Sequence, residues 1–307
     1  MHRILLDTDI GCDTDDWFAL GHLLARDDCE LLGITTVCGS CDRRAMLADM
    51  TCRLAGKDVP IYAGQDKTLI GRKPMGGMVK REEDMLYCYP HRTDIEKYQA
   101  LEFQRRLIES HPGEIDLVSI GMLTNIALLF SAYPYIPSLL RSFTIMGGRY
   151  SDNEYCSIQK WGMYECNIRS DAEAAAAVFR AAPAKTRVLG VELSCQYWQS
   201  NAVLSAEAAK VKHLKPVSDV IKHGTEGVWF HDPMAVYSVF DPDCFVWQRG
   251  DIEISLDNDT FGKSTFTPCE NGRFLLALSG DKERFFNGYG KPLGIELHAV
   301  ETPKYNQ

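Results

Sequence analysis

The chain has 307 residues, a formal net charge of −9 and an isoelectric point of about 5.4. This acidic balance argues against a general nucleic-acid or anionic-membrane binder, which would present a basic face. No apolar run reaches the roughly 18 residues that a membrane-spanning helix needs, and the first residues lack the apolar core of a signal peptide. We therefore expect a cytoplasmic protein without nucleic-acid or membrane partners.

Short apolar runs alternate with longer helical patterns along the first two thirds of the chain. We expect strands over 4–6, 30–37, 60–63, 115–120, 142–146 and 185–191, and helices over 15–26, 43–55, 95–110, 123–131 and 171–181. This alternation is typical of βαβ units and of a parallel sheet covered by helices on both faces.

The last third is expected to hold helices near 201–211, 216–223 and 281–289, with apolar runs at 244–247, 252–256 and 273–277. No linker, repeat or low-complexity tract divides the sequence. We predict one α/β domain over residues 1–307, with a mainly parallel central sheet flanked by helices. Two long irregular stretches, 65–92 and 147–163, follow predicted strands and are candidate lids over a site.

An acidic loop directly follows the first predicted strand. It holds five carboxylates, Asp7, Asp9, Asp13, Asp15 and Asp16. Such crowding of like charges is costly unless a positive charge lies among them. Carboxylate oxygens suit a hard cation such as Ca²⁺ or Mg²⁺. The carboxyl end of a strand is also where open α/β sheets place their ligand sites.

Three further stretches hold residues that could bind a ligand or take part in a reaction. Thr124 follows a predicted strand and opens a helix. Glu165 and Asn167 are two positions apart, which in extended backbone places both side chains on one face, suited to grip a polyol. Pro233 at a helix start puts Asp232 near that helix's N-terminus. Taken alone, Asp232 fits a simple helix cap and His231 a structural histidine.

The eleven cysteines are scattered along the chain, which indicates mostly buried free thiols in a reducing compartment. Cys38 and Cys41 form a CxxC pair. A zinc site would need a second ligand pair, and none is present, so a lone match carries little weight.

Together, these stretches resemble the inosine–uridine-preferring nucleoside hydrolase family. The resemblance is carried by Asp7-Thr-Asp-Ile-Gly-Cys-Asp-Thr-Asp-Asp-Trp-Phe-Ala-Leu20, Gly33-Ile-Thr-Thr-Val-Cys-Gly39, Gly121-Met-Leu-Thr-Asn125 with Ala127, Glu165-Cys-Asn-Ile168, and His231-Asp-Pro with Ala235 and Val236. It implies a single-domain α/β fold with one bound Ca²⁺. The implied reaction is hydrolysis of the N-glycosidic bond of a ribonucleoside, giving ribose and a free base. It also implies a homodimer or homotetramer.

The resemblance also implies roles for individual residues. The ligands of Ca²⁺ would be Asp9, Asp16, the backbone carbonyl of Thr124, and Asp232. Asp15 would be the general base acting on a calcium-bound water, and His231 would assist departure of the base. The substrate contacts would come from Glu165, Asn167, Gln159 and Ser40, the last two standing where the family often has asparagine.

The acidic loop is two residues longer than in many family members, so Asp13 competes with Asp15 for the role of base, and we favour Asp15 because it adjoins Asp16. Two other functions remain open. A haloacid dehalogenase-type phosphatase would use the Asp7-Thr-Asp9 pair, but it leaves the rest of the loop unexplained. A weakly active protein that binds calcium and a ribosyl ligand is suggested by Ser40 and Gln159.

Overall fold

The first predicted strand lies inside a nine-stranded sheet of order β10-β9-β11-β6-β5-β4-β1-β2-β3. In the computed structural model, which describes residues 1–153, 164–222 and 226–303, its strands are β1 His2–Thr8, β2 Cys29–Thr36, β3 Ile61–Ala63, β4 Ile115–Ser119, β5 Ser142–Met146, β6 Thr186–Leu189, β9 Phe245–Ile254, β10 Ser264–Pro268 and β11 Phe274–Gly280. Neighbouring strands from β3 to β11 pair in parallel, and only β9 pairs antiparallel, with β10 and β11. The expected mainly parallel sheet is confirmed.

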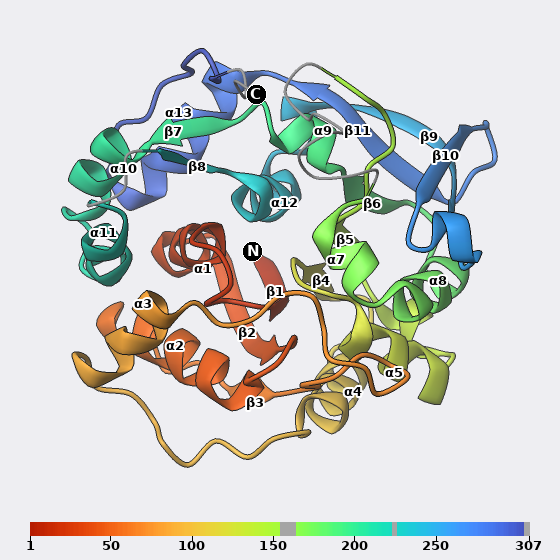
Figure 1. The fold of residues 1–307 in the computed structure, drawn as a ribbon, viewed down its shortest axis with the longest axis horizontal. Coiled ribbons are helices and arrows are strands. Elements are labelled where there is room, and N and C mark those ends of the chain that lie inside the picture. The colour runs from red at the N-terminus through yellow and green to blue at the C-terminus, as the bar shows by residue number, and fades with distance from the viewer. Residues whose placement is uncertain (154–163, 223–225, 304–307) are drawn as a thin grey trace.

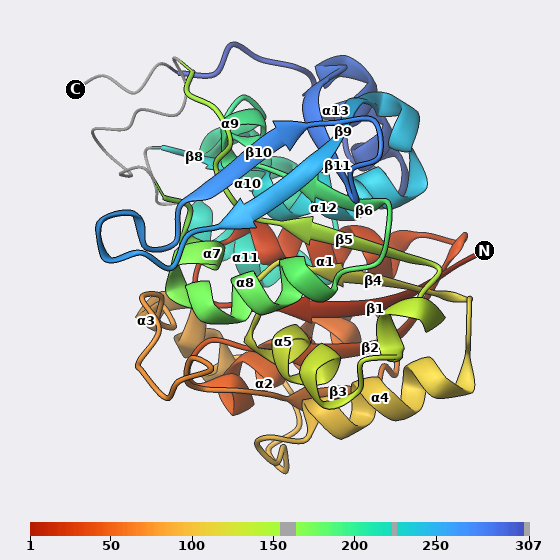
Figure 2. The same ribbon diagram turned by 90° about the vertical axis from the view of Figure 1, so that its right-hand side faces the viewer.

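Alternate residues of the central strands feed two separate hydrophobic cores. Ile4 and Leu6 of β1 pack in one core, and Leu5 between them packs in the other, as the two-residue period of a strand requires. The first core includes α1 Asp15–Ala25, α2 Cys41–Leu54, α12 His231–Phe240 and α13 Lys282–Leu293. The second includes α4 Ala100–Ser110, α5 Thr124–Ala132 and α8 Ala172–Ala181. The result is a single α/β domain with helices on both faces of the sheet (Figures 1 and 2).

Several shorter elements complete the fold. They are α3 Lys80–Glu83, α7 Cys166–Ser170, α9 Val191–Ser194, α10 Asn201–Ala208, α11 Lys215–Ile221, and an antiparallel ribbon of β7 Trp198–Ser200 and β8 Gly227–Trp229. In Figure 2 the strands run across the view from the N-terminus at right, and α3 and α7 lie at the opposite side. None of the helices in the described part of the chain is long and apolar enough to cross a bilayer.

Several elements differ from the expectations. Helix α4 begins at Ala100 rather than near residue 95, because Tyr98 has a φ of 65° that ends any helical run before it. The apolar runs at 244–247 and 252–256 lie mostly in one strand, β9, which spans Phe245–Ile254. The edge strand β10 was not predicted, since most of its side chains are at least partly exposed and its sequence is rich in Thr and Ser.

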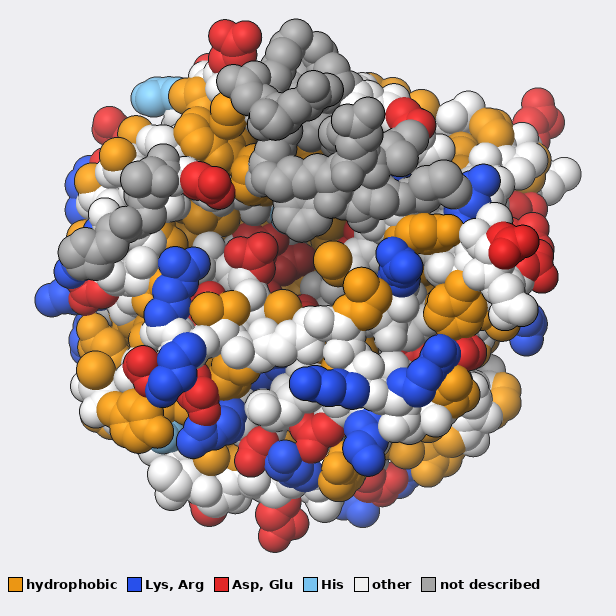
Figure 3. Space-filling model, viewed as in Figure 1, with side chains coloured by type: hydrophobic (Ala, Val, Ile, Leu, Met, Phe, Trp, Pro, Cys, Tyr) orange, Lys and Arg blue, Asp and Glu red, His pale blue; other side chains and the backbone are white. Residues whose placement is uncertain are grey.

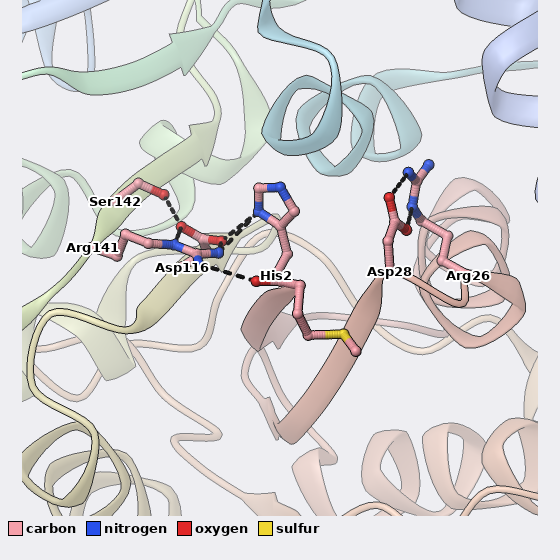
Figure 4. Close-up of polar contacts among 7 residues, drawn as sticks. His2, Arg26, Asp28, Asp116, Arg141 and Ser142 are labelled. Atoms are coloured by element: carbon pink, nitrogen blue, oxygen red, sulfur yellow. Dashed lines mark hydrogen bonds and ion pairs between the residues drawn. The ribbon is translucent and has the colours of Figure 1, made fainter.

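A polar cluster ties β1, β4 and β5 together at their amino ends, away from the acidic loop (Figure 4). Asp116 accepts hydrogen bonds from Arg141 at 2.8 Å and Ser142 at 2.6 Å, and His2 Nδ1 lies 2.9 Å from it. Burial alone would raise the pKa of Asp116, but the bonds from Arg141, Ser142 and His2 outweigh it and lower the pKa. These contacts hold the amino ends of the three strands together.

Candidate active site

The acidic loop lines a pocket of about 560 Å³ at the carboxyl ends of the strands. Ile120, which follows β4, and Met146, which ends β5, form part of its wall. Gly11 allows the loop to turn, because its φ of +99° is unfavourable for any other residue. Figure 3 shows acidic side chains in a hollow near the middle of this face. The structure therefore places the loop where a ligand can enter.

Three carboxylates from two helices meet in this pocket. Asp15 and Asp16 begin α1, and Asp232 lies in the first turn of α12. One oxygen from each lies within 4.8 Å of the others. The backbone N–H of Asp232 donates to Asp15 Oδ2 at 3.1 Å, and Thr8 donates its hydroxyl to Asp16. The packing of α1 on α12 thus brings together segments more than 200 residues apart.

Burial raises the pKa of all three carboxyl groups well above its ordinary value, and repulsion from neighbouring aspartates raises it further. Such a group gains stability by taking up protons or a cation. The ligand atoms that these three residues offer to a cation are all carboxylate oxygens, with no imidazole or thiolate among them. Ca²⁺ and Mg²⁺ prefer such oxygen ligands. The residues present therefore fit a hard divalent cation.

The remaining loop carboxylates have different surroundings. Asp9 lines the pocket, and burial raises its pKa although the Arg44 guanidinium opposes the rise. Asp9 lies outside the group of three carboxylates that the described residues form. Asp13 is exposed at the pocket, and its Oδ1 accepts the backbone N–H of Thr14 at 2.8 Å. The five aspartates are therefore not equivalent.

Thr124 begins α5 but is not among the residues that line the pocket. Its hydroxyl donates to Asp171 Oδ2 at 2.5 Å. Its role as a carbonyl ligand stays a prediction.

The expectation of extended backbone through Glu165 and Asn167 is wrong. Glu165 caps α7, and its carboxylate accepts the backbone N–H groups of Asn167 at 2.7 Å and Ile168 at 3.0 Å. The chain therefore turns into a helix after Glu165, because the carboxylate satisfies N–H groups that the first turn leaves free. The Asn167 amide donates to the carbonyl of Ile120 at 3.0 Å and of Met146 at 3.2 Å. Both predicted substrate residues nevertheless line the pocket.

Of the other two predicted substrate contacts, only Ser40 belongs to the part of the chain that the structure describes. Ser40 is exposed, has a φ of 50° at the start of α2, and is not among the lining residues. Gln159 lies outside the described residues.

His231 begins α12 and lines the pocket beside Asp232. Its Nδ1 lies 2.6 Å from Ser194 Oγ. Burial lowers the pKa of His231 to about 4, so the imidazole is neutral at pH 7. The predicted catalytic histidine and the carboxylates therefore share one cavity.

The CxxC thiols are free and buried, as expected. The Cys41 thiol donates to the carbonyl of Gln65 at 3.0 Å, and burial raises the pKa of both Cys38 and Cys41.

A sequence model described as "Inosine-uridine preferring nucleoside hydrolase" matches residues 4–287 of the chain. The chain belongs to this family. It is therefore an N-glycosyl hydrolase of nucleosides, and the haloacid dehalogenase-type phosphatase is rejected.

Individual relatives agree with this assignment. The inosine-uridine preferring nucleoside hydrolase of Crithidia fasciculata is 30% identical over 97% of this chain and 97% of its own. Uridine nucleosidase 1 of Arabidopsis thaliana is 30% identical over 82% of this chain and 78% of its own. The solved purine-preferring ribonucleoside hydrolase from Gardnerella vaginalis has the same fold, with a TM-score of 0.79 at 20% identity over 95% of this chain and 98% of its own.

Several pocket residues of this nucleoside hydrolase were missed by the sequence analysis. Arg81 of α3, Asn201 at the start of α10, and Glu226 before β8 line the pocket. They come from short elements that have no motif of their own. Their nearness to the strand ends exists only in the folded chain, and no pattern in the sequence indicated it.

Behind the pocket of the nucleoside hydrolase, Asp7 is a structural anchor. Its Oδ1 accepts hydrogen bonds from Asn125 at 2.8 Å, Thr35 at 2.5 Å and Gln104 at 3.4 Å. Burial raises the pKa of Asp7 to about 7 even though these bonds oppose the rise. The network joins β1 to β2, α4 and α5 beneath the acidic loop.

We expect Asp7→Ala to lower the free energy of unfolding by about 3 kcal/mol, because it leaves buried donors on Asn125 and Thr35 unsatisfied. Urea denaturation followed by circular dichroism measures the change. Asp7→Asn is the matched control, since it retains an acceptor oxygen and should cost less. An Asp7→Ala variant as stable as the wild type would contradict this anchoring role.

Proposed function

We propose that this nucleoside hydrolase uses Ca²⁺ to hydrolyse the N-glycosidic bond of a ribonucleoside, giving ribose and a free nucleobase. The observation that carries the proposal is the meeting of Asp15, Asp16 and Asp232 in one pocket with Glu165 and Asn167. The proposed cation ligands and the proposed sugar contacts thus line one pocket.

Asp16 and Asp232 are the proposed side-chain ligands of the cation, with Asp9 and the Thr124 carbonyl as further ligands. Their support is the convergence of Asp16 and Asp232 within the carboxylate group and the position of Asp9 on the same pocket wall. When bound, Ca²⁺ lowers the pKa of a water and orients the ribose 2′- and 3′-hydroxyls.

Asp15 is the proposed general base that takes a proton from the attacking water. Its support is its position: Oδ2 accepts the Asp232 N–H at 3.1 Å, which fixes the side chain beside the proposed ligands. Burial, and then repulsion from neighbouring carboxylates, raises the pKa of Asp15, which makes it a stronger base than a free aspartate once it is ionised. Asp13 is the competing base, because it lines the same pocket.

The reacting sugar gains positive charge as the C1′–N bond breaks. The carboxylates of the pocket stabilise this charge. Asn167 and Glu165 are proposed to hold ribose hydroxyls; the Asn167 amide is oriented by the carbonyls at the ends of β4 and β5. His231 is proposed to donate a hydrogen bond to the departing base.

A screen of purine and pyrimidine nucleosides in Ca²⁺, scored by free base released, tests the proposal. We expect turnover of at least one ribonucleoside, and turnover of its 2′-deoxy counterpart lower by roughly 100-fold or more, because a site built for a hydroxyl is left unpaired without it. Calorimetric binding of ribonucleosides without release of base would instead support a ribosyl-ligand binding protein. Equal turnover of the ribonucleoside and its 2′-deoxy counterpart would contradict recognition of the ribose 2′- and 3′-hydroxyls.

A further inference from the structure

A buried serine contacts the proposed catalytic histidine from a different part of the fold. Ser194 is the last residue of α9, the short helix that follows β6, and its side chain is fully buried. Its Oγ lies 2.6 Å from His231 Nδ1, across a separation of 37 residues. No feature of the sequence around Ser194 indicated this pairing.

The acceptors within reach indicate where the serine proton goes. The Ser194 hydroxyl carries one proton, and its two neighbouring acceptors are His231 Nδ1 at 2.6 Å and the carbonyl of Val191 at 3.4 Å. A buried hydroxyl needs a partner for its proton, and a bond of 3.4 Å is weak. The geometry therefore favours the Ser194 hydroxyl as donor and Nδ1 as acceptor.

A neutral imidazole carries one N–H, so an accepting Nδ1 places the proton on Nε2. Among the described residues, Ser194 forms the hydrogen bond to the His231 ring, and it does so at Nδ1. Nε2 is therefore the nitrogen left for a ligand in the pocket that His231 lines. As the C1′–N bond breaks, its electron pair moves onto the nucleobase, where an N–H donor stabilises the growing negative charge.

We propose that Ser194 is a positioning residue that holds His231 as the Nε2–H tautomer, with that N–H directed to the departing nucleobase. The inference rests on the proposed function only for the identity of the ligand. Ser194 is not among the described residues that line the pocket, so it would act through His231. Its effect is to fix which ring nitrogen donates and how the ring is oriented, the role that a hydrogen bond to the second nitrogen commonly has.

The tautomer is measured directly, without turnover. The full chain, loaded with Ca²⁺ and labelled with ¹⁵N-histidine, gives two-bond ¹H–¹⁵N correlations that show which nitrogen is protonated, and His231→Gln identifies the signals. We expect a protonated Nε2 and an unprotonated Nδ1 for His231. A protonated Nδ1 would overturn the proposal, whatever the enzyme hydrolyses.

Kinetics separate positioning from a general structural role. We expect Ser194→Ala to lower kcat for nucleosides by about 10- to 100-fold with little change in KM. Turnover of 4-nitrophenyl β-D-ribofuranoside should be unchanged, because 4-nitrophenolate leaves without help from a donor. Ser194→Thr, which keeps the hydroxyl, should retain turnover of nucleosides if it folds.

Ser238→Ala is the matched control, because Ser238 is a fully buried serine of α12 whose hydroxyl donates to the Ala235 carbonyl at 2.8 Å within the same helix. It should leave both substrates unaffected. Equal losses on both substrates for Ser194→Ala, or no loss on either, would overturn the positioning role. If the wild type hydrolyses no riboside, the proposed function fails, while the tautomer measurement still decides the Ser194–His231 contact.

Discussion

Replacing Asp15 by asparagine should reduce kcat by roughly 10²- to 10⁴-fold, the contribution typical of a general base. Asparagine has the shape of aspartate and keeps an oxygen that can accept the Asp232 backbone N–H. The start of α1 should therefore remain folded. The measurement is steady-state release of base at saturating nucleoside, with circular dichroism to verify the fold.

Two matched variants show whether the loss belongs to Asp15. Asp9→Asn should weaken cation binding, so raising the Ca²⁺ concentration should restore much of its activity, whereas it should not rescue Asp15→Asn. Asp13→Asn should stay near wild-type activity, because Asp13 is exposed at the mouth of the pocket. A loss in Asp13→Asn as large as the one expected for Asp15→Asn would assign the base to Asp13. Near-normal turnover of Asp15→Asn would likewise remove it from that role.

The fold was predictable where local pattern and tertiary structure agree. The strands β4 and β5 and the carboxyl-terminal halves of β1 and β2 are buried on both faces, so they read as short apolar runs between helices. The edge strand β10 and the short ribbon strand β7 lack such runs, because edge and ribbon strands need little apolar surface. Their pairing depends on a neighbouring strand, which the local sequence does not reveal.

The site was predictable only in part, for the same reason. The acidic loop and the His231-Asp232 segment carry compact patterns, and the structure brings both to one pocket. The contact of Ser194 with His231 depends on how β6 and β8 direct the segments that follow them. The Glu165 carboxylate caps α7 by accepting two backbone N–H groups of the helix, and it also accepts the N–H of Gly148 from a distant segment. Neither arrangement has a sequence pattern beyond the residue type.

Exhaustive chelation should abolish hydrolysis and lower the melting temperature, and added Ca²⁺ should restore both. The stabilisation follows from binding to the folded state alone, and it amounts to about 2.7 kcal/mol when the cation is at 100 times its Kd. Base release and thermal unfolding, measured on chelated, Ca²⁺-replete and Mg²⁺-replete samples, test the dependence. Mg²⁺ is the control for ion size, because it demands tighter octahedral geometry than Ca²⁺.

Proton linkage gives this prediction a second, independent measurement. In the metal-free protein, burial and mutual repulsion raise the pKa of Asp15, Asp16 and Asp232 well above its ordinary value. A cation must displace the protons that these groups retain, so binding should release protons and the affinity for Ca²⁺ should fall as the pH falls. Calorimetry in buffers of different ionisation enthalpy counts the protons released. Two results would exclude a cation from the carboxylate group. One is full activity after complete metal removal. The other is Ca²⁺ binding that neither raises the stability nor releases protons.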